Sequence, residues 1–452
     1  MAIDSPISLN LPPYPYANHL LEQMEIYMGH DYHWFLRRRF KERMNSTYKT
    51  LGSLESRDRL WLCRLLIVFA LGETFVNYHT PVIHLGPTTN QPYGQDSQPE
   101  QVAVVTPPPP PGTAFFEQAL MLLKLPFEEP SLEHIEILNL ATFYSYSLNR
   151  KKAAYMYAGM SARMCNLLGL HQCPPQTYSE LEKEHRKRVC WTSYCLDKMT
   201  SSELGLLPSF QPSQIKLDYP SDQQLELGDA DQFFEADFLR ARIQLTLMKA
   251  EADIFIDLWQ SIRDDIPDGE RRVRPILLKL ENWSHELPAS LKFDCEAGMP
   301  EAMAQAPNMR SLASLYLRWQ QCFILLLRPF FLKQITYIVS DELNEPFQDH
   351  NLKVLSDTCI RAARSNLSIE IGLWQRERIA KDLLHDLVRA GNLASKGHEK
   401  MLQDIEALGE VLGSMQTNAS DFMLEQWDMD NWMAQVLSMD SSSLPFYGFD
   451  EG

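Results

Sequence analysis

Residues 130–169, the stretch that decides the fold, read PSLEHIEILNLATFYSYSLNRKKAAYMYAGMSARMCNLLG. The spacing of their apolar side chains predicts two antiparallel helices. Ser131 is placed to cap the first helix, because a serine oxygen at that position can accept a backbone N–H. Asn149 and Arg150 are predicted to make the turn. The buried face of the first helix is predicted to consist of Leu132, Ile135, Leu138 and Phe143.

The second helix of this hairpin, roughly residues 151–168, is rich in alanine and glycine. Small residues let two helix backbones approach closely, so Gly159 and Ala162 are predicted to lie at the contact with the first helix. Gly169 can adopt the left-handed conformation that ends a helix. Hairpins of this kind stack in tetratricopeptide-like arrays, although no strict repeat recurs along this chain.

A third helix is predicted to start at Ser179, which together with Glu182 fits the two reciprocal hydrogen bonds of a capping box. Gly205 is predicted to end it. The helix carries a basic run, RKR at 186–188, one turn after Glu182 and Glu184. Because oppositely charged residues four apart pair on one helix face, this run favours structural salt bridges over a nucleic-acid contact.

The rest of the chain shows helical spacing from Ala17 to about Leu437 and few strand signals. The sequence therefore predicts an all-α fold, an irregular array of stacked antiparallel helix pairs. Residues 80–112 interrupt the pattern and contain five consecutive prolines at 107–111. Because proline cannot donate a backbone hydrogen bond, this segment is predicted to be an exposed, extended Pro-rich loop. A spacer is favoured over a site that recruits an SH3-like partner.

Composition sets limits on function. The 42 lysines and arginines against 59 acids give a formal charge of -17, which counts against autonomous binding to nucleic-acid phosphates. The eight cysteines form no C-x-x-C pair, so neither a zinc framework nor a disulfide framework is expected. The two most apolar stretches, 61–71 and 315–332, are interrupted by Arg64, Arg318 and Arg328 and are predicted to be core helices.

No catalytic motif is present: the chain has no H-E-x-x-H, no Gly-rich phosphate loop and no complete G-x-S-x-G. His30 and His33 are three residues apart, a spacing that occurs often by chance, so we expect no metal, no cofactor and no enzymatic activity. His171 is expected to be a structural hydrogen-bonding residue. The basic run RRRFKER at 37–43 leaves two alternatives open, a nuclear import signal and the solvated face of a short helix.

Two segments resemble a known family. They are AAYMYAGMSARMCNLLGLH at 153–171 and SELEKEHRKRVCWTSYCLDKMTSSELG at 179–205. Together they resemble the middle homology region of fungal zinc-cluster transcription factors. Shorter similarities lie at Trp34-Phe35, at 218–220 (DYP) and at 327–330 (LRPF), so the likeness covers roughly residues 11–400. The resemblance implies a nuclear regulatory helical domain over 11–400 that is not an enzyme.

The chain also departs from the family pattern. Lys187 and Cys190 replace an Arg and a Trp, which is a mild change. The family reads DNA through six cysteines that bind two zinc ions ahead of this region, whereas no cysteine here precedes Cys63. Direct base recognition is therefore not expected from this sequence. DNA would be reached through a partner, or through a zinc domain missing from the gene model.

Residues 401–452 are predicted to form a C-terminal helix and an acidic, hydrophobic tail. The tail, 421–452, has seven acidic residues and no Lys or Arg. Acids that alternate with bulky apolar residues are typical of activation segments, which bind a coactivator groove as a transient helix. The alternative is a last helix packed on the domain. The candidate activation residues are Phe422, Leu424, Trp427, Met429, Trp432 and Met433.

The resemblance and the tail lead to one hypothesis: the chain is a nuclear transcriptional regulator, an activator of a fungal gene set such as a metabolic or secondary-metabolite gene cluster. Expected partners are the transcription machinery or a coactivator, a homo- or heterodimer partner, and a small-molecule effector bound in a groove of the helical array. The alternatives are a scaffold that does not bind DNA, a heterodimer partner of a DNA-binding factor, and a truncated gene model of a zinc-cluster factor.

Overall fold

The computed structural model describes residues 9–49, 58–76, 109–123, 129–226, 228–261, 266–292, 309–339 and 350–376. The chain divides into two compact units, Met1–Lys396 and Gly397–Gly452, and every described residue belongs to the first unit. Most of the predicted Pro-rich loop, the predicted C-terminal segment 401–452 and the six candidate activation residues lie outside the described residues.

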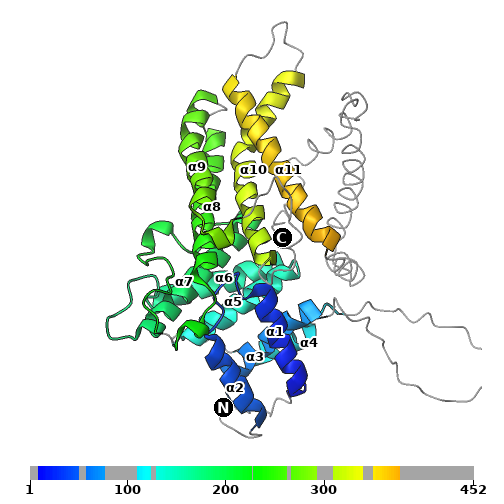
Figure 1. Cartoon of the computed structure of the whole chain (residues 1–452), viewed down its shortest axis with the longest axis vertical. Coiled ribbons are helices and arrows are strands. Elements are labelled where there is room, and N and C mark those ends of the chain that lie inside the picture. The colour runs from blue at the N-terminus through cyan, green and yellow to red at the C-terminus, as the bar shows by residue number, and fades with distance from the viewer. Residues whose placement is uncertain are drawn as a thin grey trace, which may run out of the picture. The chain divides into compact units, whose positions relative to one another are not determined.

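All regular elements of the described part are helices, so the all-α prediction is confirmed (Figure 1). Three short 3-10 turns occur at Pro212–Gln214, Ala230–Gln232 and Ala289–Leu291. None of the described helices is long and apolar enough to cross a membrane. The helices are α1 (Tyr14–Met28), α2 (Arg37–Lys49), α3 (Arg59–Val76), α4 (Thr113–Leu122), α5 (Leu132–Ser147), α6 (Lys151–Leu167), α7 (Glu180–Leu204), α8 (Ala236–Ser261), α9 (Ile266–Glu286), α10 (Met309–Val339) and α11 (His350–Arg376).

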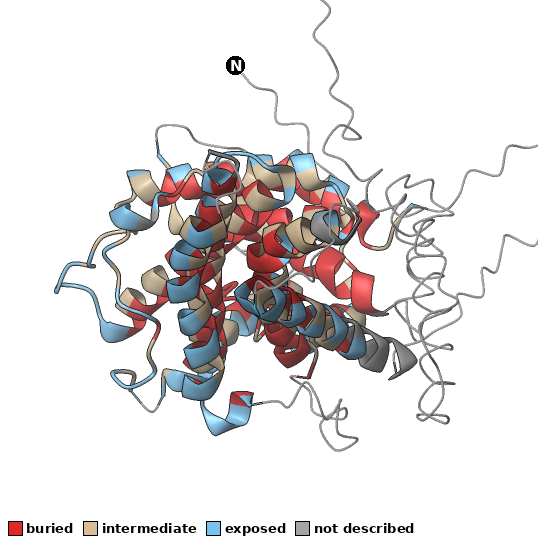
Figure 2. Ribbon diagram, turned by 90° about the horizontal axis from the view of Figure 1, so that it is seen from above, coloured by how far each residue is buried: buried red, intermediate tan, exposed pale blue. Residues whose placement is uncertain are grey.

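The described helices build two large hydrophobic clusters, and a third, small cluster consists of Leu36, Leu181 and Phe233. Helices α1 through α7 supply most of the first large cluster, and helices α8 through α11 supply most of the second. Helix α8 belongs to both, because Leu239 and Ile243 pack in the first cluster whereas Phe238 and Leu245 pack in the second. Figure 2 shows the buried residues on the helix sides that face one another. Each fully buried Leu, Ile or Phe side chain contributes about 1.5 to 3 kcal/mol to the free energy of unfolding, so these buried faces stabilise the helical array.

The predicted hairpin is confirmed as α5 and α6, which pack against each other. The Ser131 hydroxyl accepts the backbone N–H of His134, and Nδ1 of His134 accepts the backbone N–H of Ser131 at 3.2 Å. A histidine thus takes the place that Glu or Gln usually holds in a capping box. Asn149 has a φ of 56° in the turn, and Gly169 has a φ of 65° just after α6 ends. Local signals therefore placed both helix boundaries.

The predicted buried face of α5 is too narrow. Every residue from His134 to Ser145 is buried, including the polar ones, whereas Leu132 is only partly buried. The reason is that α5 packs against α3, α6 and α7 and has no solvated side over this length. A helix surrounded by neighbours is buried all round, so an amphipathic pattern underestimates its contacts.

The prediction that Gly159 makes the close hairpin contact is wrong. A Cβ atom at Gly159 would lie 3.2 Å from Nη1 of Arg163 and 3.3 Å from Oγ of Ser209, and no atom of α5 would be within 4 Å of it. Ala162, by contrast, is fully buried. Backbone approaches that require a glycine are found instead at Gly72 of α3, where a Cβ would overlap the carbonyl group of Leu20 in α1, and at Gly112, where it would overlap that of Ala70.

Helix α7 begins and ends as predicted. The Ser179 hydroxyl accepts the N–H of Glu182 at 3.2 Å, and Gly205 follows the helix with a φ of 64°. Only this half of the predicted capping box is formed in the described structure, because the Glu182 carboxylate instead accepts Nε of Arg186 at 2.7 Å. The predicted salt-bridge face is confirmed, since Lys187 and Arg188 both pair with Glu184.

Candidate functional site

The basic run at 37–43 is engaged in the fold. Nε of Arg37 lies 3.0 Å from a Glu25 carboxylate oxygen, and Nη1 of Arg38 lies 2.9 Å from Asp231. Arg43 pairs with both Asp58 and Glu133. These three arginines connect α2 to α1, to the segment before α8 and to α5. Arg38, Arg39, Lys41 and Glu42 are exposed, so the run fits the alternative of a solvated face on a short helix, and its ion pairs give that face a structural role.

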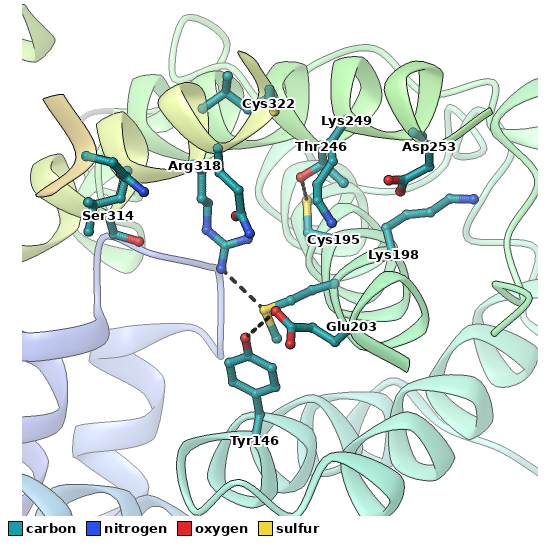
Figure 3. Close-up of a pocket in the computed structure, with 16 residues that line it drawn as sticks. Tyr146, Cys195, Lys198, Glu203, Thr246, Lys249, Asp253, Ser314, Arg318 and Cys322 are labelled. Atoms are coloured by element: carbon teal, nitrogen blue, oxygen red, sulfur yellow. Dashed lines mark hydrogen bonds between the residues drawn. The ribbon is translucent and has the colours of Figure 1, made fainter. Parts of the chain in front are cut away.

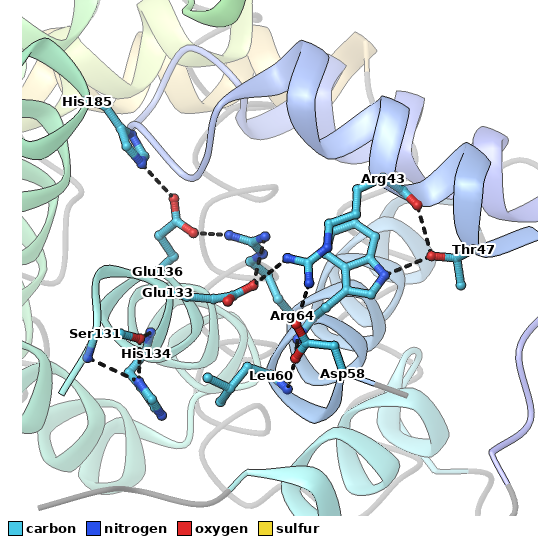
Figure 4. Close-up of polar contacts among 11 residues, drawn as sticks. Arg43, Thr47, Asp58, Leu60, Arg64, Ser131, Glu133, His134, Glu136 and His185 are labelled. Atoms are coloured by element: carbon cyan, nitrogen blue, oxygen red, sulfur yellow. Dashed lines mark hydrogen bonds and ion pairs between the residues drawn. The ribbon is translucent and has the colours of Figure 1, made fainter. Parts of the chain in front are cut away.

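A buried polar network runs through the first cluster (Figure 4). Arg64 of α3 forms a short ion pair with Glu136 of α5 and lies 3.0 Å from Glu133. Oε1 of Glu136 lies 3.4 Å from Nε2 of His185 in α7. Nδ1 of His185 lies 2.8 Å from Nε2 of His33, which is in the segment between α1 and α2. The network therefore links three helices and one connecting segment.

The protonation states of this network follow from burial. Burial raises the pKa of Glu136 to about 7, although Arg64 beside it opposes the rise. Burial lowers the pKa of His185 to about 3 and lowers the pKa of His33 well below its ordinary value of 6.5. A neutral His185 that donates Nε2–H to Glu136 leaves its Nδ1 free to accept Nε2–H from His33. Glu136 and the two facing histidine nitrogens then each have a partner, as buried polar groups require, whereas Nε of Arg64 is buried without one.

This geometry separates the two histidines that the sequence placed three apart. His33 faces His185, whereas the ring of His30 packs 4.7 Å from that of Phe234. Asp31, between them, pairs with Arg242 at 2.6 Å. The described residues contain no group of three or more His, Cys, Asp or Glu side chains that could hold a metal ion.

The two neutral histidines give stability a pH dependence with a definite sign. Below about pH 6.5 the unfolded histidines bind protons that the folded ones do not, so stability rises with pH between the lowered folded pKa of His185, about 3, and 6.5. Glu136 acts in the opposite direction between 4.5 and about 7, because its folded form holds a proton that the unfolded form loses.

We expect His185→Gln to remove one of the two histidine contributions that make the free energy of unfolding rise with pH. Between about pH 5 and pH 6.5 the variant should gain about 1.5 kcal/mol less stability than the wild-type chain. Urea unfolding at the two pH values measures this difference, with wild type and variant compared in the same buffers. Identical changes in the free energy of unfolding would mean that His185 is not held neutral.

A pocket of about 230 Å³ lies between α5, α7, α8, α10 and α11, where the two clusters meet (Figure 3). Residues of the first cluster, such as Cys195 and Met199, and of the second, such as Leu245 and Cys322, both line it. Its lining is unusually rich in charge for its size, since binding pockets are mostly apolar. The charged lining residues are Lys198, Glu203, Lys249, Asp253 and Arg318.

The chemistry of the pocket suits binding. Burial raises the pKa of the Cys195 thiol to about 11 and that of Cys322 to about 12, so both thiols stay protonated and are poor nucleophiles. The Tyr146 hydroxyl donates to Glu203 at 3.2 Å, and Nζ of Lys151 lies 2.8 Å from the same carboxylate. None of the residues that line the described pocket is a histidine.

In the sequence, Arg64 and Arg318 stand out only because they interrupt apolar stretches. That interruption is the signal, because burying a charge within an apolar helix is costly and so marks a position with polar surroundings. Arg64 holds the buried network, and Arg318 reaches the pocket. His185 and Lys249 were missed, since nothing in their sequence neighbours distinguishes them from ordinary surface residues.

The short motifs that resembled the family are packing residues. Tyr219 stacks on the ring of Trp191, and Nε1 of Trp191 donates to the carbonyl oxygen of Asp218 at 3.0 Å. Trp34 and Phe330 are buried. The backbone carbonyl oxygen of His171 accepts the N–H of Lys216 at 2.9 Å, but Nδ1 of its ring is buried and makes no hydrogen bond, so the expected side-chain hydrogen bond is not found at that atom.

The fungal specific transcription factor domain, as a protein family, matches residues 35–284. This range is more than half of the 452 residues. The chain belongs to the fungal specific transcription factor domain family. In this family member Arg64, Glu136 and His185 of the buried network lie inside the matched range, and His33 lies just before it. Part of the pocket lining lies outside the matched range, because Arg318 and Asn366 belong to α10 and α11.

The relatives of this fungal transcription factor domain are regulatory proteins. The thiamine repressible genes regulatory protein thi1 of Schizosaccharomyces pombe is 25% identical over 280 residues, which are 62% of this chain and 32% of that protein. The fusaridione A cluster transcription factor fsdR of Fusarium heterosporum is 26% identical over 167 residues, 35% of this chain and 30% of that protein. The nitrogen assimilation transcription factor nit-4 of Neurospora crassa is 26% identical over 237 residues, 48% of this chain and 21% of that protein.

The chain therefore spans about a third or less of the length of each of these three relatives. No solved structure matches it significantly. The relatives support membership of the family, and the described helices supply its all-α body.

Proposed function

We propose that this chain regulates the transcription of a fungal gene set, with residues 11–400 as its regulatory helical domain. The observation that carries the proposal is the family match over residues 35–284. Relatives are named for thiamine repressible genes, for a fusaridione A cluster and for nitrogen assimilation, which supports a metabolic or secondary-metabolite gene set as the target. As a regulator, the protein would act in the nucleus.

Gene deletion followed by transcript sequencing tests this proposal. The expected result is a coordinated change in the transcripts of a limited group of genes, reversed when the gene is restored. Restoration with the His185→Gln variant serves as a control, because that substitution alters stability at low pH and leaves the pocket intact. A deletion strain with unchanged transcripts under several nutrient conditions would contradict a regulatory role.

DNA contact is expected to come from a partner or from a zinc domain elsewhere in the gene. The acid excess weakens attraction to phosphates, and three arginines of the most basic run are held in ion pairs. The purified chain should therefore give no sequence-specific complex in a mobility-shift assay. A specific shift with the pure chain would mean that it reads bases by itself.

The tail at 421–452 is proposed as the segment that contacts a coactivator. Fused to a heterologous DNA-binding domain, it should activate a reporter, and the double substitution Trp427→Ala with Trp432→Ala should remove most of that activity. The reason is that a few bulky aromatic residues usually anchor such contacts. Ser441→Ala with Ser442→Ala is the matched control and should leave activity unchanged. An inert tail would favour the alternative of a last packed helix.

A further inference from the structure

Arg318 presents a cationic group to the pocket, and none of the described carboxylates lies at ion-pair distance from it. Its guanidinium reaches from α10 toward α5 and α7, and its hydrogen bond goes to Sδ of Met199 at 3.3 Å (Figure 3). A thioether sulfur is a weak acceptor, whereas a guanidinium carries five N–H donors. Asp31 attracts this guanidinium only from a distance, because its carboxylate is paired with Arg242 at 2.6 Å. A partly buried charge in this condition has unsatisfied binding capacity.

Lys249 adds a second cation to the same space. It reaches from α8 and donates to the hydroxyl of Ser202, and the described residues give it no ion pair. Glu203, the nearby carboxylate, is already paired with Lys151 at 2.8 Å. The pocket thus offers two cationic donors with no described carboxylate at ion-pair distance, and the attraction between Lys249 and Glu203 acts over a longer range.

The pocket also contains an acceptor without a partner. Oδ1 of Asn366, from α11, is buried and makes no hydrogen bond. Asp253 lines the pocket as well and forms no ion pair within the described residues. An unpartnered buried acceptor costs free energy, so a ligand that brings a donor to Asn366 would be bound more tightly.

The size of the pocket limits the ligand. A cavity of about 150 Å³ can hold benzene, so a pocket of about 230 Å³ has room for about nine non-hydrogen atoms. The pocket is also at the junction of the two hydrophobic clusters, a common position for ligand sites. A ligand there would connect α10 and α11 to α5 and α7.

We propose that this pocket binds a small carboxylic acid that also carries a hydroxyl or amino group. Its carboxylate would lie between Arg318 and Lys249, because a guanidinium matches a carboxylate with two parallel hydrogen bonds. Its donor group would meet Oδ1 of Asn366. A free phosphate shares the anionic chemistry, but its second negative charge is opposed by the carboxylates of Glu203 and Asp253. This binding does not depend on the proposed function. Only the idea that the acid controls transcription rests on the proposed function.

Titration calorimetry with the full chain tests the proposal. The probes are lactate, glycerate, serine and threonine, which each have one carboxylate, with inorganic phosphate in a separate arm. We expect saturable binding of at least one acid at one site per chain, tighter than that of phosphate. Arg318→Gln and Lys249→Met should each weaken it about tenfold or more, because a charged hydrogen bond is lost. Arg361→Gln, an exposed cation on α11, is the matched control and should bind like wild type.

Stability separates a ligand-binding Arg318 from a purely structural one. Without ligand, Arg318→Gln should have a Tm equal to or above that of the wild-type chain, because the arginine has no ion pair with a described carboxylate to lose. A lower Tm together with unchanged acid binding would overturn the proposal. So would a wild-type chain that binds none of the four acids, or one that binds phosphate more tightly than every acid. Lys249→Met provides the same test if Arg318→Gln fails to fold.

Discussion

Gly72→Ala is expected to destabilise the chain by about 3 kcal/mol, because the added methyl group would overlap the carbonyl group of Leu20 where α3 crosses α1. Both partners in this clash are backbone atoms, so no side chain can rotate away to relieve it. Relief would require α1 and α3 to move apart, which opens the first hydrophobic cluster.

Gly159→Ala is the matched control, since it is also a glycine inside a helix. Its new methyl group would meet only the ends of the Arg163 and Ser209 side chains, at 3.2 and 3.3 Å. Alanine favours the helix by up to about 1 kcal/mol, so this variant should be between unchanged and slightly more stable. Urea unfolding at neutral pH measures both. Equal stabilities of the two variants would show that α1 and α3 do not cross at Gly72.

Arg64→Met is expected to cost about 3 to 5 kcal/mol, because it leaves the buried Glu136 carboxylate without its cation. The pKa of Glu136, already raised to about 7 by burial, should rise further. A folded carboxyl with a raised pKa lowers stability as pH rises through the window above 4.5, so the cost of the substitution should grow with pH. Unfolding measured on either side of pH 7 gives this dependence.

Two further variants show whether the lost stability comes from the buried charge. Arg64→Met combined with Glu136→Gln removes the uncompensated carboxylate and should recover a large part of the stability. Lys279→Met breaks an exposed ion pair with Glu251 at 2.7 Å and should cost about 1 kcal/mol or less. If the double variant is no more stable than Arg64→Met alone, the loss comes from packing instead.

The sequence predicted the elements whose signals are local. Ser131, Asn149 and Gly169 mark the ends of α5 and α6, and Ser179 and Gly205 mark those of α7, because caps and left-handed residues act within one turn of the chain. The salt-bridge face of α7 was equally predictable, since its partners are three or four residues apart.

The contacts that depend on distant segments could not be predicted. His33 and His185 are 152 residues apart, and the residues next to either one in the sequence do not indicate that the two histidines are in contact. Gly72 and Gly159 look alike in sequence, yet only the position of α1 decides which of them needs to be a glycine. Likewise, nothing near Arg318 specifies Lys249 or Asn366, because α8, α10 and α11 form the pocket together.

Tethering the whole chain to a reporter promoter through a heterologous DNA-binding domain tests the regulatory role most directly. Reporter transcript is measured against the DNA-binding domain alone, with equal protein levels in nuclear extracts. We predict that the fusion raises the transcript and that removal of residues 421–452 lowers it again. A fusion that is stable and nuclear, but gives the same transcript level as the DNA-binding domain alone, would contradict a role in transcription.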